Sequence, residues 1–172
     1  VRHSEQLEQL YARRGYSAIW GDPRLHADLI RAIAEVERDG LTPSDYWLEP
    51  ILTFRIRPDV PEDAADLDLL HTDALIRLAH DLRHGKVRAN NPTAGRDLSR
   101  PLTGTDVLTD LERMLAGGSL YADLQELKPQ HYIYRGLVAS LEHFRAIEAA
   151  GAWEPVPAGP TLRPGDRHPR VE

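Results

Sequence analysis

The sequence predicts an all-α fold, an irregular multi-helix domain of about six helices with a long mid-chain loop and a Pro-rich C-terminal linker. Three observations support this class. Apolar residues recur at helical spacing in most segments, helix-start and helix-stop residues flank those segments, and strand patterns are nearly absent. The only alternating candidate is "TFRIR", residues 53–57.

The first predicted helix spans residues 4–14, with Leu7, Leu10 and Tyr11 on one face. The second lies between Asp22, which is placed to cap it, and Gly40, which is placed to end it, with a proline at its first position. Its apolar stripe consists of Leu25, Leu29, Ile33 and Val36.

A short helix of one or two turns is predicted after Thr42, because Pro43 follows this capping residue and Asp45 lies three residues on. Residues 55–63 are rich in proline and are predicted to form a connection.

A long helix is predicted over Glu62 to His84, ended by Gly85. Its apolar residues gather in one sector, which we expect to form the buried stripe. The members of this stripe are Leu67, Leu70, His71, Ala74, Leu75, Leu78 and Leu82.

Residues 86–103 show no periodicity and are rich in turn formers. A loop of this length inside a compact domain is usually functional or mobile.

Three helices are predicted in the last third of the chain, over residues 105–116, 119–127 and 129–150. The stripe of the first consists of Val107, Leu111, Met114 and Leu115. The stripe of the last consists of Ile133, Tyr134, Leu137, Val138, Leu141 and Phe144.

The composition changes after Trp153, where prolines and glycines become dense. We therefore predict a helical domain over residues 1–153 and a Pro-rich linker over residues 154–172. Because this linker leads onward, we expect the chain to be a segment of a longer protein.

The composition of the chain argues against several classes of function. The 172 residues carry a net charge of −6 with both signs interspersed, so we expect no nucleic-acid partner. No apolar run approaches the roughly 20 residues that span a bilayer. The chain has no cysteine, which excludes a thiolate nucleophile within it and suits an oxidising compartment.

The stretch "HDLRH", from His80 to His84, is close to the zinc-protease pattern H-E-x-x-H. Asp81 stands where the pattern has its general base and is one methylene shorter than glutamate. His71 falls on another side of the same helix, although a catalytic zinc needs three protein ligands.

The extended zinc pattern also fails, because Asn90 and Val87 stand where its third histidine and its glycine would be. We expect His80 and His84 to lie on a solvated or weakly packed helix face, where cationic histidines suit the helix C-terminus.

Other candidates are weaker. Solvated helix faces explain Glu112, Glu126, Glu142 and Glu148 better than a glycosidase pair does. Three tryptophans at helix junctions, Trp20, Trp47 and Trp153, favour helix packing over sugar stacking. The basic residues Arg163, Arg167 and Arg170 fit a solvated linker better than an anion-binding tail. The sequence therefore assigns no catalytic, cofactor-binding or metal-binding residue, and no cofactor.

Five motifs follow one another along the chain. They are Y-x-x-R-x-Y-x-x-x-W at residues 11–20, D-G-L-x-P-x-D-Y at 39–46, L-x-T-D-A at 70–74 with G-K-V at 85–87, P-x-x-x-x-Y-x-x-L at 129–137, and G-x-W at 151–153. Their order and spacing resemble the amino-terminal scaffold region of the large periplasmic murein L,D-transpeptidases of Gram-negative bacteria, over residues 5–171.

This resemblance implies a non-catalytic scaffold in a periplasmic cell-wall enzyme, with peptidoglycan and the adjoining modules of the same chain as partners. In that family a separate module uses a cysteine, activated by a histidine, to take a tetrapeptide stem as a thioester and pass it to a diaminopimelate amine. The segment "GPTLRPGDRHPRV" leads there into a peptidoglycan-binding module.

None of the catalytic residues of that family exists in this chain, so we expect the chain alone to be inert. The alternative is a free-standing helical module that binds peptidoglycan or a wall protein.

Overall fold

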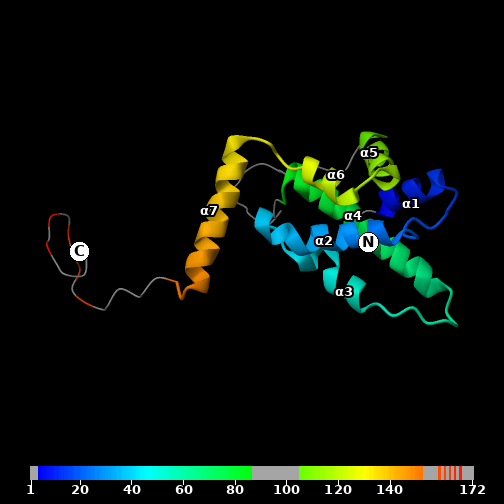
Figure 1. Cartoon of the computed structure of the whole chain (residues 1–172), viewed down its shortest axis with the longest axis horizontal. Coiled ribbons are helices and arrows are strands. Elements are labelled where there is room, and N and C mark those ends of the chain that lie inside the picture. Colours follow the sequence, from blue (N-terminus) through cyan, green and yellow to red (C-terminus); the bar gives the residue numbers. More distant parts are fainter. Residues whose placement is uncertain are drawn as a thin grey trace.

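The computed structural model describes residues 4–86 and 105–152, together with the single positions 159, 161, 163, 165 and 167. The described residues form seven α-helices and two short 3-10 helices, with no strand among them (Figure 1). In chain order these are α1 (Ser4–Arg13), α2 (Pro23–Glu35), η1 (Val36–Asp39), η2 (Pro43–Tyr46), α3 (Leu48–Thr53), α4 (Glu62–His84), α5 (Thr105–Ala116), α6 (Leu120–Glu126) and α7 (Tyr132–Ala149). The all-α class is confirmed, and the candidate strand at 53–57 is wrong.

Local signals explain most of the helix ends. Asp22 accepts a hydrogen bond from the Arg24 backbone N–H at 2.9 Å and caps α2, as predicted. The helix then tightens into η1, and Gly40 closes it in the left-handed region at φ 75°. The last helix begins at Tyr132 rather than at residue 129, because His131 caps it by accepting from the Ile133 N–H.

The helix α4 is the centre of the bundle. Helices α1, α2, α3 and α6 and the turn η2 all pack against it. Burial on α4 therefore extends beyond the predicted stripe: Ile76, which is not part of that stripe, is only 1% exposed, and Ala79 is also buried. At the other end of the helix, Leu67 and Leu70 are only half-buried, because fewer elements cover that end.

The carboxylate of Asp68, on α4, holds the N-terminal part of the chain in place. It accepts hydrogen bonds from the Tyr11 hydroxyl, from the Ile19 N–H at 3.0 Å and from the Trp20 N–H at 2.9 Å. One turn along α4, the Thr72 hydroxyl accepts from the Trp20 indole N–H at 2.9 Å. The predicted packing role of Trp20 is thereby confirmed.

The second described tryptophan is held in a strained conformation. Trp47 has φ 59°, a left-handed value that costs a bulky residue about 1–3 kcal/mol. Its indole N–H donates to the buried Asp73 carboxylate at 2.7 Å. The Arg77 guanidinium donates to the same oxygen at 2.6 Å and lies 5.0 Å from the indole ring centre. These contacts offset the strain and let the chain turn from η2 into α3, a helix that the sequence did not predict.

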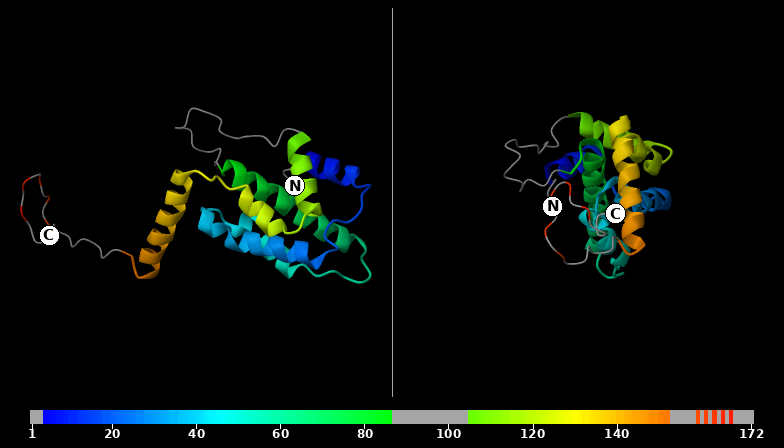
Figure 2. Two further views of the ribbon diagram at one scale, coloured as in Figure 1. Left: turned by 45° about the horizontal axis from the view of Figure 1, so that its top comes forward. Right: turned by 90° about the vertical axis from the view of Figure 1, so that its left-hand side faces the viewer.

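The helix α7 stands at one end of the bundle, apart from the other helices (Figures 1 and 2). Its main contacts are with η1. The predicted apolar stripe exists, but none of its residues is buried. Leu137 is 65% exposed and Phe144 is 55% exposed. By contrast, Leu111, Met114 and Leu115 of α5 are buried, as predicted.

Replacing Asp68 should test its anchoring role. In Asp68→Ala, the two backbone N–H groups and the tyrosine hydroxyl lose their charged acceptor in a buried environment, and we expect a loss of about 3–5 kcal/mol in the free energy of unfolding. Chemical denaturation measures it. Asp66→Ala, an exposed residue of the same helix, is the control and should change stability by less than about 0.5 kcal/mol. Equal stabilities of the two variants would contradict the anchor.

A second test uses pH. The Arg57 guanidinium hydrogen-bonds the Asp63 carboxylate at 2.6 and 2.7 Å and holds its pKa at about 2, below the ordinary 3.8. Because this pKa is depressed in the folded state, the stabilisation is complete above about pH 4 and is lost as pH falls toward 2. NMR titration of the Asp63 carboxyl should show a higher midpoint in Arg57→Ala and no change in Arg55→Ala. An unchanged midpoint in Arg57→Ala would contradict the ion pair.

Candidate functional site

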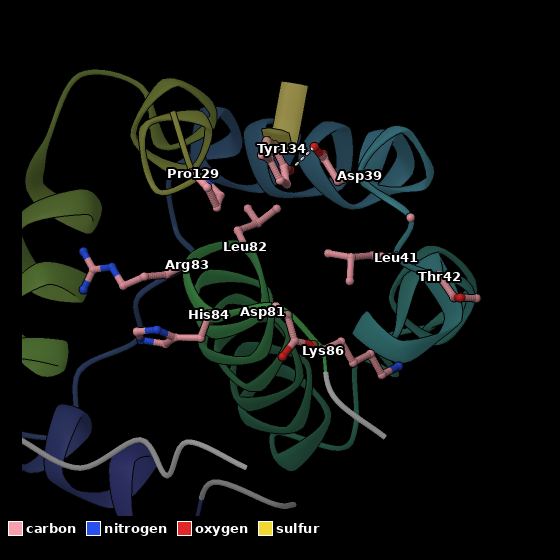
Figure 3. A pocket seen from close by; sticks show the side chains of 12 residues that line it. Asp39, Leu41, Thr42, Asp81, Leu82, Arg83, His84, Lys86, Pro129 and Tyr134 are labelled. Carbon is pink, nitrogen blue, oxygen red and sulfur yellow. Dashed lines mark hydrogen bonds between the residues drawn. The ribbon is translucent and has the colours of Figure 1, made fainter. Parts of the chain in front are cut away.

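The candidate site is a cavity of about 370 Å³ where the C-terminal end of α4 meets η1 and the start of α7 (Figure 3). It is lined by residues 39–42, residues 81–86, Pro129 and Tyr134. We call it the junction pocket, because α4 ends and α7 begins at its wall. The chemistry that the pocket can support depends on how the polar side chains around it are already engaged.

The Asp39 carboxylate fixes the start of α7. One oxygen accepts from the Tyr134 hydroxyl at 2.5 Å, and the other meets the Lys128 ammonium at 2.6 Å. Burial raises the pKa of Tyr134, so its hydroxyl remains a proton donor near neutral pH. Further along α7, the Arg145 guanidinium donates to the Glu37 carbonyl of η1. The helix is therefore held by polar contacts rather than by a buried face.

The end of α4 is held in a similar way. One oxygen of Asp81 accepts from the Tyr46 hydroxyl at 2.8 Å, and the other lies 3.0 Å from the His80 Nδ1. Burial raises the pKa of Tyr46, which keeps this phenol protonated. Lys86, which lines the pocket, forms an ion pair with Asp45 of η2. Asp81 thus has a structural partner on each oxygen.

The histidine pair of "HDLRH" is correctly placed on one face, but that face is not wholly solvated. His80 is half-buried and His84 is exposed, with their ring centres 5.1 Å apart. Between them, Arg83 pairs with Asp110 of α5 at 2.8 Å, so α5 covers part of this face. His71 lies on another side of α4 and contacts His26 instead.

Among the residues that the structure describes, no group of three or more His, Asp or Glu side chains is arranged to hold a metal ion. Asn90 and Val87, which the extended zinc pattern concerns, lie outside the described residues.

The other residues that the sequence analysis considered for a functional site do not gather at one place in the structure. Glu112 pairs with Arg13 at 3.4 Å, while Glu126, Glu142 and Glu148 are exposed on α6 and α7. Arg163 and Arg167 are exposed. Trp153 and Arg170 lie outside the described residues.

The junction pocket itself was not identified from the sequence, yet its residues come from three of the quoted motifs. The D-G-L-x-P-x-D-Y motif supplies Asp39, Gly40 and Leu41, G-K-V supplies Lys86, and P-x-x-x-x-Y-x-x-L supplies Pro129 and Tyr134. These motifs lie up to about 95 residues apart, as the Asp39–Tyr134 hydrogen bond shows. The sequence did not reveal the pocket because nothing in it showed that these motifs meet in the fold.

The fold and the pocket define a small all-α domain in which polar side chains fasten the end of one helix and the start of another. The family follows from a direct comparison: a family model described as "Scaffold domain" matches residues 5–141. The chain belongs to this scaffold domain family. No curated protein and no solved structure gives a significant match. Among the described residues, no helix is both long and apolar enough to cross a membrane.

Removing the Asp39 carboxylate should loosen α7 without unfolding the bundle. In Asp39→Ala, Tyr134 and Lys128 lose their shared acceptor, while the core is untouched because no residue of α7 is fully buried. We expect at least tenfold faster amide hydrogen exchange across residues 132–149, with little change in the exchange of α4. Glu142→Ala, an exposed residue of α7, is the control. Exchange rates equal to the control would contradict the role of Asp39.

Proposed function

We propose that this domain is the scaffold of a periplasmic murein L,D-transpeptidase, which positions a Cys-dependent catalytic module and a peptidoglycan-binding module relative to each other. Such an enzyme cross-links the peptide stems of peptidoglycan. In this proposal the helical domain covers residues 1–153, and residues 154–172 form the linker toward the binding module. The domain itself carries no chemical step.

The observation that carries the proposal is the convergence of three motifs on the junction pocket. These motifs, which resemble those of the transpeptidase scaffold region, do not assemble an acid, a base and a nucleophile. Asp39, Asp81 and Asp45 are each engaged by a side chain of the same domain. Their contacts instead fix the point where α4 ends at Gly85 and the direction in which α7 leaves.

A positioning role requires this kind of construction. A module tethered only by a flexible linker samples many orientations, whereas a module that follows a fastened helix samples few. Fixing the approach of a nucleophile to its substrate is a recognised source of rate acceleration. The family match over residues 5–141 supports the scaffold part of the proposal.

The first experiment is an immunoblot of the native protein in its own cells, with an antibody raised against this domain. The proposal expects a band several times larger than 19.4 kDa in the periplasmic or envelope fraction. A band near 19.4 kDa would contradict a modular enzyme and favour the free-standing binding module. Co-sedimentation of the domain with purified sacculi then distinguishes a wall-binding module from a scaffold that does not bind by itself.

The second experiment measures activity in the whole enzyme. With Asp39→Ala in the full-length protein, we expect a several-fold decrease in stem cross-links formed per enzyme molecule, because the module beyond α7 is less well oriented. The control is Glu142→Ala, compared at equal protein level in the same cells. Cross-linking equal to that of the control would overturn the positioning role.

A further inference from the structure

Two histidines far apart in the sequence meet at the opposite end of α4 from the junction pocket. His26 of α2 and His71 of α4 lie with Nδ1 and Nε2 only 2.7 Å apart. They line a cavity of about 460 Å³ together with the side chains of Trp20, Leu67 and Asp68. The proposed scaffold function uses neither the pair nor this cavity.

The hydrogen bond from His71 to a backbone carbonyl shows which of its ring nitrogens carries the proton. Its Nδ1 lies 2.7 Å from the backbone carbonyl of Leu67, which can only accept, so Nδ1 carries the proton. Its Nε2 therefore has a free lone pair, which faces His26. Metal-binding histidines are typically oriented in this way, with the second ring nitrogen donating to a backbone carbonyl or a carboxylate.

The surroundings hold His71 in a fixed orientation. The side chain is only 2% exposed. The indole of Trp20 stacks on the ring with the two ring centres 5.0 Å apart, which restricts its rotation. The Asp68 carboxylate, on the same helix, contributes a negative charge near a bound cation. His26 is only half-buried, so its ring can adjust.

The distance between the two nitrogens favours a particular class of metal. Two histidine ligands at bond lengths of about 2.05 Å and a right angle have nitrogens about 2.9 Å apart, whereas a tetrahedral zinc separates them by about 3.3 Å. The observed 2.7 Å is a hydrogen-bond distance, so the first geometry requires the smaller movement of the two rings. Square-planar or tetragonal nitrogen sites are typical of Cu(II) and Ni(II), and Cu(II) binds most tightly in the divalent series.

We propose that His26 and His71 form a two-histidine site for a tetragonal divalent metal ion, with Cu(II) the preferred one. The metal takes the place of the shared proton. His26 loses the proton from Nδ1 and gains one on Nε2, while His71 keeps its Nδ1 proton, so no net proton is released. Water molecules from the cavity fill the remaining coordination positions, because no third protein ligand lies among the described residues.

Copper titration tests the site directly. All variants carry His3→Ala, His80→Ala and His84→Ala, which removes the histidine nearest the amino end and the histidine pair near the C-terminal end of α4. In this background we expect one Cu(II) per chain, with an electron paramagnetic resonance spectrum that shows two coordinated imidazole nitrogens. Adding His26→Ala should weaken binding at least tenfold and remove one nitrogen from the spectrum.

A folding control distinguishes the loss of a metal ligand from the loss of the folded structure. Circular dichroism checks that His26→Ala remains folded, which we expect because His26 is only half-buried. His71→Gln is the second variant and should likewise weaken binding at least tenfold. The same affinity and spectrum in the His26→Ala variant as in its background would overturn the proposal, as would the absence of copper binding in that background. Neither result depends on transpeptidase activity, so the scaffold function is judged separately.

Discussion

The fold depends first on one buried carboxylate. Asp68 accepts from a side chain of α1 and from two backbone N–H groups in the connection between α1 and α2, so three chain segments share a single charge. A buried carboxylate is tolerated only when hydrogen bonds replace its water, and here three donors do so. Because these donors come from residues about 50–60 positions earlier, the anchor forms only when the N-terminal segment is already docked on α4.

The two ends of α4 serve different purposes. Around Asp68 and Thr72, the polar contacts are buried and hold the bundle together. Around Asp81 and Lys86, they lie beside an open cavity and fasten the parts of the chain that enter and leave it. The central stretch between them is covered on most sides by other helices. A rigid central helix with polar clamps at each end suits a domain whose proposed task is to hold other modules in fixed directions.

The helix α7 is attached to the bundle mainly by polar contacts. It is amphipathic, but none of its apolar residues is fully buried, and its attachment relies on Asp39, Tyr134, Lys128 and Arg145. Ion pairs and hydrogen bonds near the surface contribute less than a buried apolar face. The direction of α7 is thus set by a few specific contacts, and for this reason the junction pocket is central to the proposed positioning role.

The sequence by itself determined the helical class and most helix boundaries, since capping residues such as Asp22 and terminators such as Gly40 act over one turn of chain. It also correctly predicted that Trp20 packs in the structure. It could not determine which faces of α4 and α7 are covered, because helical periodicity marks an apolar stripe but not its partner: Ile76 is buried and Leu137 is exposed against expectation. Only the tertiary structure brought Asp39 to Tyr134 and His26 to His71, because contacts between residues 45 or 95 positions apart depend on how the helices pack and not on local spacing.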